Sequence, residues 1–144
     1  MKKIKYFLLF ILLIGMFACP ISVAAQTYRF EVTVMEVEVY IEEDGSISIW
    51  YLMDFQNRAD ADPIDFIDIG MPSSAYSLNT IQAEVDGKPI TEIESSPYVP
   101  NGFALGLGAD AIQPGQTGRV TVWIPGVRNV LSRYDNPDRE NYTN

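Results

Sequence analysis

The sequence contains no histidine, and its single cysteine, Cys19, lies within the first 25 residues. Most catalysis near neutral pH uses an imidazole, a thiolate or a metal held by these side chains. Residues 26–144 therefore lack an imidazole and a thiolate, which closes most of these routes, and we expect no enzyme. They also cannot form a disulfide within the chain, so the packing of apolar side chains must supply the stability.

Lysine is almost as scarce. Three of the four lysines precede Tyr6, which leaves Lys88 and six arginines to oppose all 19 acidic residues. Seven basic against 19 acidic side chains give residues 26–144 a net charge of −12. Such a field repels nucleic acid and anionic membrane surfaces and favours basic partners or divalent cations. We therefore expect no nucleic-acid partner.

The N-terminal segment, residues 1–25, has the composition of a signal peptide. Basic Met1–Lys5 precedes the apolar run Tyr6–Ala18, and Val23-Ala24-Ala25 offers small residues for cleavage before Gln26. The apolar run has signal-peptide rather than membrane-spanning length. We expect an exported, extracytoplasmic protein, secreted or at the cell surface. An uncleaved anchor, or a lipoprotein acylated at the single cysteine, are the alternatives.

The next hundred residues alternate apolar and polar side chains, the period of a half-buried strand. Residues 28–34 place apolar side chains at even positions and residues 35–41 at odd positions, which predicts a β-bulge or a strand that crosses between sheets. Further strands are expected at 47–55, 64–69, 81–85, 90–93, 103–107 and 120–124, with turns at Asp44-Gly45, Asp86-Gly87, Pro97–Gly102 and Pro114-Gly115. This spacing predicts an all-β domain over residues 26–127, an immunoglobulin-like β-sandwich of seven or eight short antiparallel strands.

The C-terminal segment, residues 128–144, differs from the rest. It is polar, mixed in charge and interrupted by Pro137, with no sustained alternation. We interpret it as a polar tail or linker, or as the start of a further module. On the second interpretation, any membrane association would come from the leader or from a segment beyond Asn144.

Two groups of residues invite a ligand-site interpretation. Gly106-Leu107-Gly108-Ala109-Asp110-Ala111 fits a loose dinucleotide-binding pattern, but Pro114-Gly115 would stop the helix that this pattern requires. We expect these glycines to serve strand bending or close packing, and no nucleotide cofactor. The loop aspartates could offer oxygen ligands to Ca²⁺, although Ile64 stands where a third ligand is needed. These residues are Asp60, Asp62, Asp65 and Asp68. A solvated acidic loop is the favoured interpretation, with a weak calcium site as the alternative.

Carboxylates and aromatics mark the polar faces of the expected strands. Glu36 and Glu38 share one face, where such residues usually keep a sheet surface hydrated rather than hydrolyse glycosides. Trp50 and Trp123 lie at the positions of their strands that alternate with the apolar residues, on the expected outer face. Tyr98 lies in an expected turn. Outward aromatics can stack on sugars or fill a partner's pocket. We predict no catalytic residue, no cofactor and no metal ligand.

The strand pair around Glu43-Asp44-Gly45-Ser46, the strand ending Met53-Asp54-Phe55-Gln56-Asn57, and Ile112-Gln113-Pro114-Gly115 entering Val120-Thr121-Val122 carry a resemblance. Over most of residues 28–127 the chain resembles the N-terminal extracytoplasmic β-domain of uncharacterised bacterial membrane-anchored proteins. The resemblance implies further β modules or a membrane segment beyond residue 144, and it transfers no functional residue. We predict a non-enzymatic, cell-surface β-sandwich module with a structural or protein-interaction role, whose partners are other surface proteins or glycans. A carbohydrate-binding module that uses exposed aromatics is the alternative.

Overall fold

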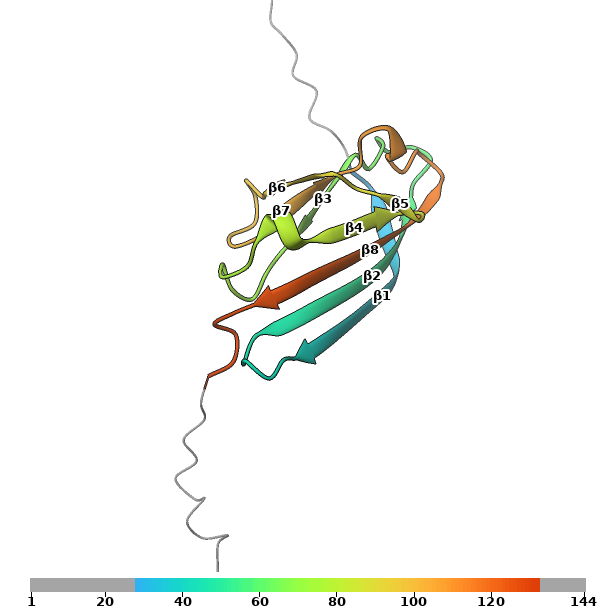
Figure 1. The fold of residues 1–144 in the computed structure, drawn as a ribbon. Coiled ribbons are helices and arrows are strands. Elements are labelled where there is room, and N and C mark those ends of the chain that lie inside the picture. The colour runs from blue at the N-terminus through green and yellow to red at the C-terminus, as the bar shows by residue number, and fades with distance from the viewer. Residues whose placement is uncertain (1–27, 133–144) are drawn as a thin grey trace, which may run out of the picture.

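The computed structural model describes residues 28–132, which form eight strands and two short 3-10 turns (Figure 1). The strands are β1 (Phe30–Ile41), β2 (Ile47–Asn57), β3 (Phe66–Ile69), β4 (Gln82–Val85), β5 (Lys88–Pro89), β6 (Glu92–Ser95), β7 (Phe103–Gly106) and β8 (Thr117–Val127), and the turns are η1 (Leu78–Thr80) and η2 (Gly108–Asp110). The predicted signal peptide, and residues 133–144 of the predicted tail, lie outside the described residues. Within the described part, no helix has the length and apolar character needed to cross a membrane.

The strands form two antiparallel sheets that face each other. The larger sheet has the order β1-β2-β8-β4-β5, and the smaller has the order β3-β7-β6. Figure 1 shows the smaller sheet lying over the β8–β4 side of the larger one, with β1 at the far edge. The structure is therefore all-β and has the two layers of a β-sandwich, as the alternating pattern predicts.

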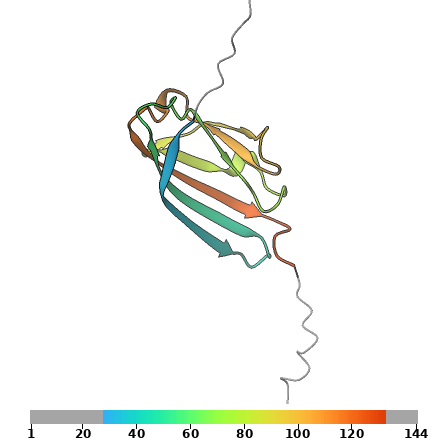
Figure 2. The ribbon, with the colours of Figure 1, turned by 180° about the vertical axis from the view of Figure 1, so that it is seen from behind.

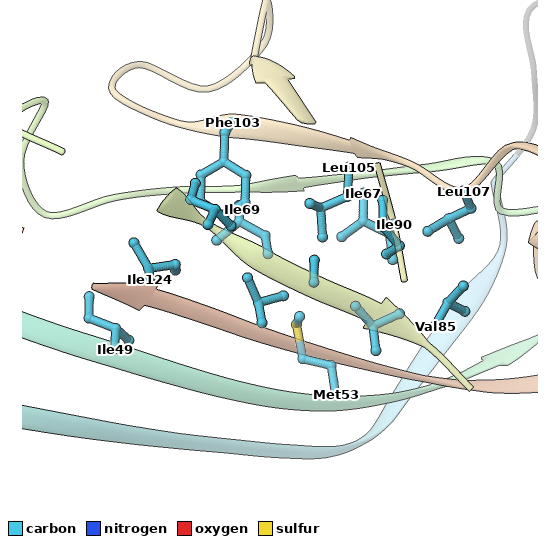
Figure 3. Packing of buried hydrophobic residues seen from close by; sticks show 14 of the residues in the cluster. Ile49, Met53, Ile67, Ile69, Val85, Ile90, Phe103, Leu105, Leu107 and Ile124 are labelled. Atoms are coloured by element: carbon cyan, nitrogen blue, oxygen red, sulfur yellow. The ribbon is translucent and has the colours of Figure 1, made fainter. Parts of the chain in front are cut away.

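The core lies between the two sheets, because the alternate apolar side chains of each strand point inward. β2, β4 and β8 contribute from the larger sheet, and β3 and β7 contribute from the smaller (Figure 3). Its most deeply buried members are Phe103, Leu105, Val120, Ile124 and Val127, each with none of its surface exposed. No residue of β1 belongs to this core.

Two predicted hairpin turns are confirmed by their backbone geometry. Between β1 and β2, the Gly45 N–H donates to the Glu42 carbonyl, and Gly45 has φ of +80°. Between β4 and β5, Asp86 and Gly87 both have positive φ, at 51° and 76°. Asparagine, aspartate and glycine tolerate this left-handed region best, which explains why Asp-Gly occupies both turns.

The change of apolar parity within β1 is a β-bulge, one of the two predicted explanations. The register with β2 shifts between Val32 and Val34, so Thr33 is the extra residue. Figure 2 shows the strand changing direction near its start. The bulge keeps Val32 and Met35 on the same, inner face of the sheet, although they are three residues apart.

The prediction of a return strand over residues 90–93 is wrong in its bounds and in the sheet that it joins. β5 ends at Pro89, and the chain then crosses to the smaller sheet, where Glu92–Ser95 pairs with β7. Ile90 remains in the core under the larger sheet, bonded through its N–H to the Ala83 carbonyl. The alternation of apolar and polar residues could not reveal this crossing. Strands of either sheet point their apolar side chains toward the same core, so both show the same pattern.

Candidate functional site

The inner face of β1 carries an uncovered row of apolar side chains. We call it the β1 apolar strip. It consists of Met35, Val37, Val39 and Ile41, which are 46–71% exposed. Their cross-strand partners in β2 include Ile47, Ile49 and Met53, all buried in the core. The strip therefore extends the core's apolar surface to a place that no second layer formed by residues 28–132 covers.

The strip is open because the two sheets differ in size. β1 has 12 residues, whereas each strand of the smaller sheet has only four. The smaller sheet lies over β8 and β4, and both ribbon views show β1 projecting beyond it (Figures 1 and 2). Exposed apolar surface that continues a core is typical of an interaction site rather than of a free surface.

β1 is also one of the two edge strands of the larger sheet, and no other strand of residues 28–132 pairs with its outer side. In the hairpin, the Glu42 N–H donates to the Ser46 carbonyl at 2.9 Å, so Glu42 bonds toward β2. Antiparallel pairing alternates along a strand, and the even-numbered residues from 34 to 42 therefore bond toward β2. The backbone groups of Met35, Val37, Val39 and Ile41 consequently point outward from the sheet edge. The same four residues present both an apolar face and free backbone groups.

The outer face of β1 is acidic. Glu31, Glu36 and Glu38 lie there, opposite Gln56, Leu52 and Trp50 of β2. Within residues 28–132, each of the five basic side chains is in an ion pair with an aspartate. None of these ion pairs involves a glutamate of β1, so the strand keeps its negative charge.

One of those ion pairs is bidentate and lies on the same outer face. Arg119 of β8 donates two bonds to the Asp54 carboxylate, at 2.6 and 2.7 Å. This bidentate bond holds the pKa of Asp54 below its usual range. Arg119 is therefore committed to Asp54.

The two tryptophans lie next to each other on the outer face of the larger sheet. Trp50 and Trp123 are direct cross-strand partners, flanked by Glu38 on β1 and Gln82 on β4. We call these four residues the Trp row. Tyr40 packs its ring edge-on against Trp123, with centroids 5.5 Å apart. This register confirms the predicted outward placement of both tryptophans, and each is half-buried.

Tyr98 lies elsewhere. It stacks on Phe66, on the outer face of the smaller sheet, with centroids 6.1 Å apart, and Tyr28 meets Phe66 edge-on. Burial and a 2.7 Å hydrogen bond to Asp65 raise the pKa of Tyr28. Tyr98 also borders a hollow of about 500 Å³ beside Tyr76. Because the two outer faces lie on opposite sides of the sandwich, the three predicted sugar-stacking aromatics do not form one platform.

The loop aspartates have separate partners. Asp60 pairs with Arg29 and Arg58, at 2.7 and 3.3 Å. Asp65 accepts from Tyr28, and Asp68 accepts from the Ser96 hydroxyl. Among residues 28–132 no three acidic side chains lie close enough to hold a metal ion.

The glycine-rich pattern at residues 106–111 does not begin a helix. β7 ends at Gly106, and η2 is a single 3-10 turn of three residues. The amide cluster that a helix N-terminus would offer to a pyrophosphate is therefore missing at this position. At Gly106, an added Cβ would lie 2.6 Å from the Glu92 side chain, which fits the expected role in close packing.

Sequence reasoning placed the strip residues on one face but missed that this face is uncovered. Strand length was the available signal, since no other expected strand matched the 14 alternating residues from Tyr28 to Ile41. The chain matches no protein-family model, and no curated protein or solved structure shows significant similarity to it. Its function must therefore be inferred from its own residues.

Proposed function

We propose that this chain is an exported, non-enzymatic module of the bacterial cell surface that binds another protein through β1. The observation that carries the proposal is the β1 apolar strip, 46–71% exposed on a free sheet edge. A long apolar edge strand promotes aggregation unless a partner covers it or charges, prolines or bulges interrupt its pairing. The described part of β1 has no proline and no inward-pointing charge, two of the usual protections.

The finer class of the fold and its setting belong to the same proposal. Eight strands in two antiparallel sheets, within about a hundred residues, are typical of immunoglobulin-like sandwiches. The composition of residues 1–25 supports export, and the acidic body supports solubility outside the cell. The absence of histidine and cysteine from residues 26–144 supports a binding rather than a catalytic role.

Site-specific photo-crosslinking in the source organism tests this proposal. A photoreactive amino acid replaces Val39, in the centre of the strip, and a control replaces Glu84 on the outer face of β4. We expect the Val39 position, but not the Glu84 position, to give one discrete adduct on intact cells, identified by mass spectrometry. A membrane-impermeant label on the same cells checks that the protein is outside. Equal crosslinking from both positions, or none from Val39, would contradict the proposal.

The Trp row supports glycan binding as a second candidate function. Two neighbouring indoles flanked by a carboxylate and an amide offer stacking faces and polar groups within one line across four strands. Sugars use this combination, because their apolar ring faces stack on aromatics while their hydroxyls bond to polar side chains.

Intrinsic fluorescence tests this second candidate directly, because Trp50 and Trp123 are the only tryptophans of the chain. If the row binds glycans, titration with polysaccharides should shift or quench the emission. Trp50→Ala should then weaken binding about tenfold, since one stacking contact contributes on the order of 1 kcal/mol. Tyr98→Ala, on the opposite face, serves as the matched control and should leave the affinity unchanged. Flat titrations across a broad glycan set would remove the candidate.

A further inference from the structure

The β1 edge has the geometry to accept one more strand. The backbone N–H and C=O groups of Val37 and Val39 point away from β2, and their side chains point to the inner face. An added strand would bond to these groups and extend the larger sheet beyond β1. Its residues directly opposite Val37 and Val39 would share the inner face with them, because paired residues point to the same side.

The charge on the outer face of β1 determines which kind of added strand would bind there. The added strand's alternate residues would lie on the outer face, opposite Glu36 and Glu38. These carboxylates are in no ion pair with the basic side chains of residues 28–132. Opposite charges across a strand pair are favourable and like charges directly opposite are unfavourable. The outer residues of the incoming strand should therefore be lysine or arginine.

A second copy of this chain is a poor occupant of the edge. Two β1 strands paired about a twofold axis at Val37 would place Glu36 of each copy opposite Glu38 of the other. An axis at Glu38 would bring the two Glu38 residues together. An axis at Val39 would place Glu36 opposite Glu42. Each of these three arrangements opposes like charges on the outer face, which disfavours a second copy paired about Val37, Glu38 or Val39.

From the unpaired edge, the β1 apolar strip and the two outer-face glutamates that form no ion pair within residues 28–132, we infer that β1 binds a β-strand of a separate protein in which apolar residues alternate with lysine or arginine. This inference names the partner's chemistry and rests on the proposed protein-interaction function. Backbone bonds along the edge would supply affinity, and the alternation of apolar and basic residues would supply specificity. The bound strand would also begin to cover the apolar strip.

A synthetic ten-residue peptide alternating valine and lysine tests the inference on the purified full chain. Its affinity is measured by fluorescence anisotropy beside a scrambled peptide of identical composition and charge. We expect the alternating peptide to bind at least about tenfold more tightly than the scrambled one, because only alternation aligns apolar and basic residues with β1. Equal binding of the two peptides would show charge attraction alone and would overturn the inference.

Two sets of variants locate the site. Val37→Pro removes an outward N–H while leaving the bonds to β2 in place, and should weaken the alternating peptide by about tenfold or more. Val37→Thr keeps the N–H and the branched shape, and is its matched control. The double variant Glu36→Lys with Glu38→Lys should reverse the preference toward a peptide alternating valine and glutamate. Because both glutamates are exposed, this variant tests the site even if Val37→Pro disturbs the fold.

Other occupants would give distinct results that overturn the inference. A stable dimer of the full chain that Val37→Pro dissociates would assign the edge to a second copy. Peptide binding that appears only after deletion of residues 133–144 would assign it to the chain's own C-terminal segment. A Val39 crosslink on cells, combined with no binding of the alternating peptide, would retain the proposed function and reject the basic strand. The reverse combination would retain the edge chemistry and reject a surface partner.

Discussion

Replacing Phe103 with alanine is expected to lower the free energy of unfolding by about 3–5 kcal/mol, the usual cost of truncating a fully buried phenylalanine. Phe103 lies in β7 of the smaller sheet, with none of its surface exposed, and points into the core from that side (Figure 3). Each strand of that sheet has only four residues, so few neighbouring side chains can move to fill the cavity. The relaxation that reduces such costs is therefore limited.

The same truncation at Phe66 is the matched control. Phe66 lies in β3, in the same small sheet, but its ring is on the outer face between Tyr28 and Tyr98. Phe66→Ala should cost about 1–2 kcal/mol, because aromatic contacts at a partly exposed site contribute less than core packing. Urea denaturation followed by circular dichroism measures both variants. Equal losses at Phe103 and Phe66 would mean that the smaller sheet does not bury its inner face as the structure shows.

A loss of 3–5 kcal/mol is large beside the total stability of a domain this size, about 5–15 kcal/mol. No disulfide can form within residues 26–144 to offset it, because Cys19 is the only cysteine. The attachment of the smaller sheet therefore depends on a few apolar side chains. Phe103→Ala should also raise hydrogen exchange in β3 and β6, the two neighbours of β7, before it does so in β2.

The local features of this fold could be predicted from the sequence, and the long-range ones could not. The parity change before Met35 predicted the bulge in β1, and Asp44-Gly45 predicted the turn that follows, because both depend on residues close in sequence. The crossing of residues 90–95 to the other sheet depends on which strands find each other across the core. Alternation contains no information about that choice.

For the candidate site too, the sequence predicted the local features and not the long-range ones. The sequence placed Val37 and Val39 on the apolar face and Glu36 and Glu38 on the polar face, and the structure confirms both placements. It could not show that the apolar face is uncovered, since that depends on how far the smaller sheet reaches. The structure confirms the outward placement of Trp50 and Trp123, whereas Tyr98 lies on the opposite layer.

Asn57 is a residue whose importance only the structure reveals. In the sequence it is a polar residue at the end of an expected strand. In the structure it is 1% exposed, and its side-chain amide donates to the carbonyls of Asp62 and Ile112, each at 2.9 Å. Its backbone N–H donates to the Gln116 carbonyl. One side chain thus joins the loop after β2 to the segment that leads into β8.

Asn57→Ala is expected to lower the free energy of unfolding by about 2–4 kcal/mol. The substitution removes two hydrogen bonds, each contributing about 0.5–1.5 kcal/mol, and leaves the Asp62 carbonyl without its amide donor, where a buried unsatisfied polar group costs about 1–3 kcal/mol. The Ile112 carbonyl keeps its bond from the Ile64 N–H. Asn57→Asp should be at least as damaging, because it replaces the donating amide by a carboxylate at a buried position. Denaturant unfolding measures both variants, with Asn79→Ala as a control at an exposed asparagine, where a change within about 0.5 kcal/mol is expected.

The segments in which hydrogen exchange increases distinguish a local effect of Asn57→Ala from a general loss of stability. The side-chain hydrogen bonds of Asn57 connect two loop segments rather than the two sheets. Hydrogen exchange should therefore increase first around residues 58–65 and 111–116. The β1 apolar strip begins beyond the bulge, and its pairing with β2 involves none of these bonds. Asn57→Ala should therefore leave peptide binding at β1 unchanged while the fold persists. A loss of both stability and binding would instead mean that the loops and the β1 edge form one cooperative unit.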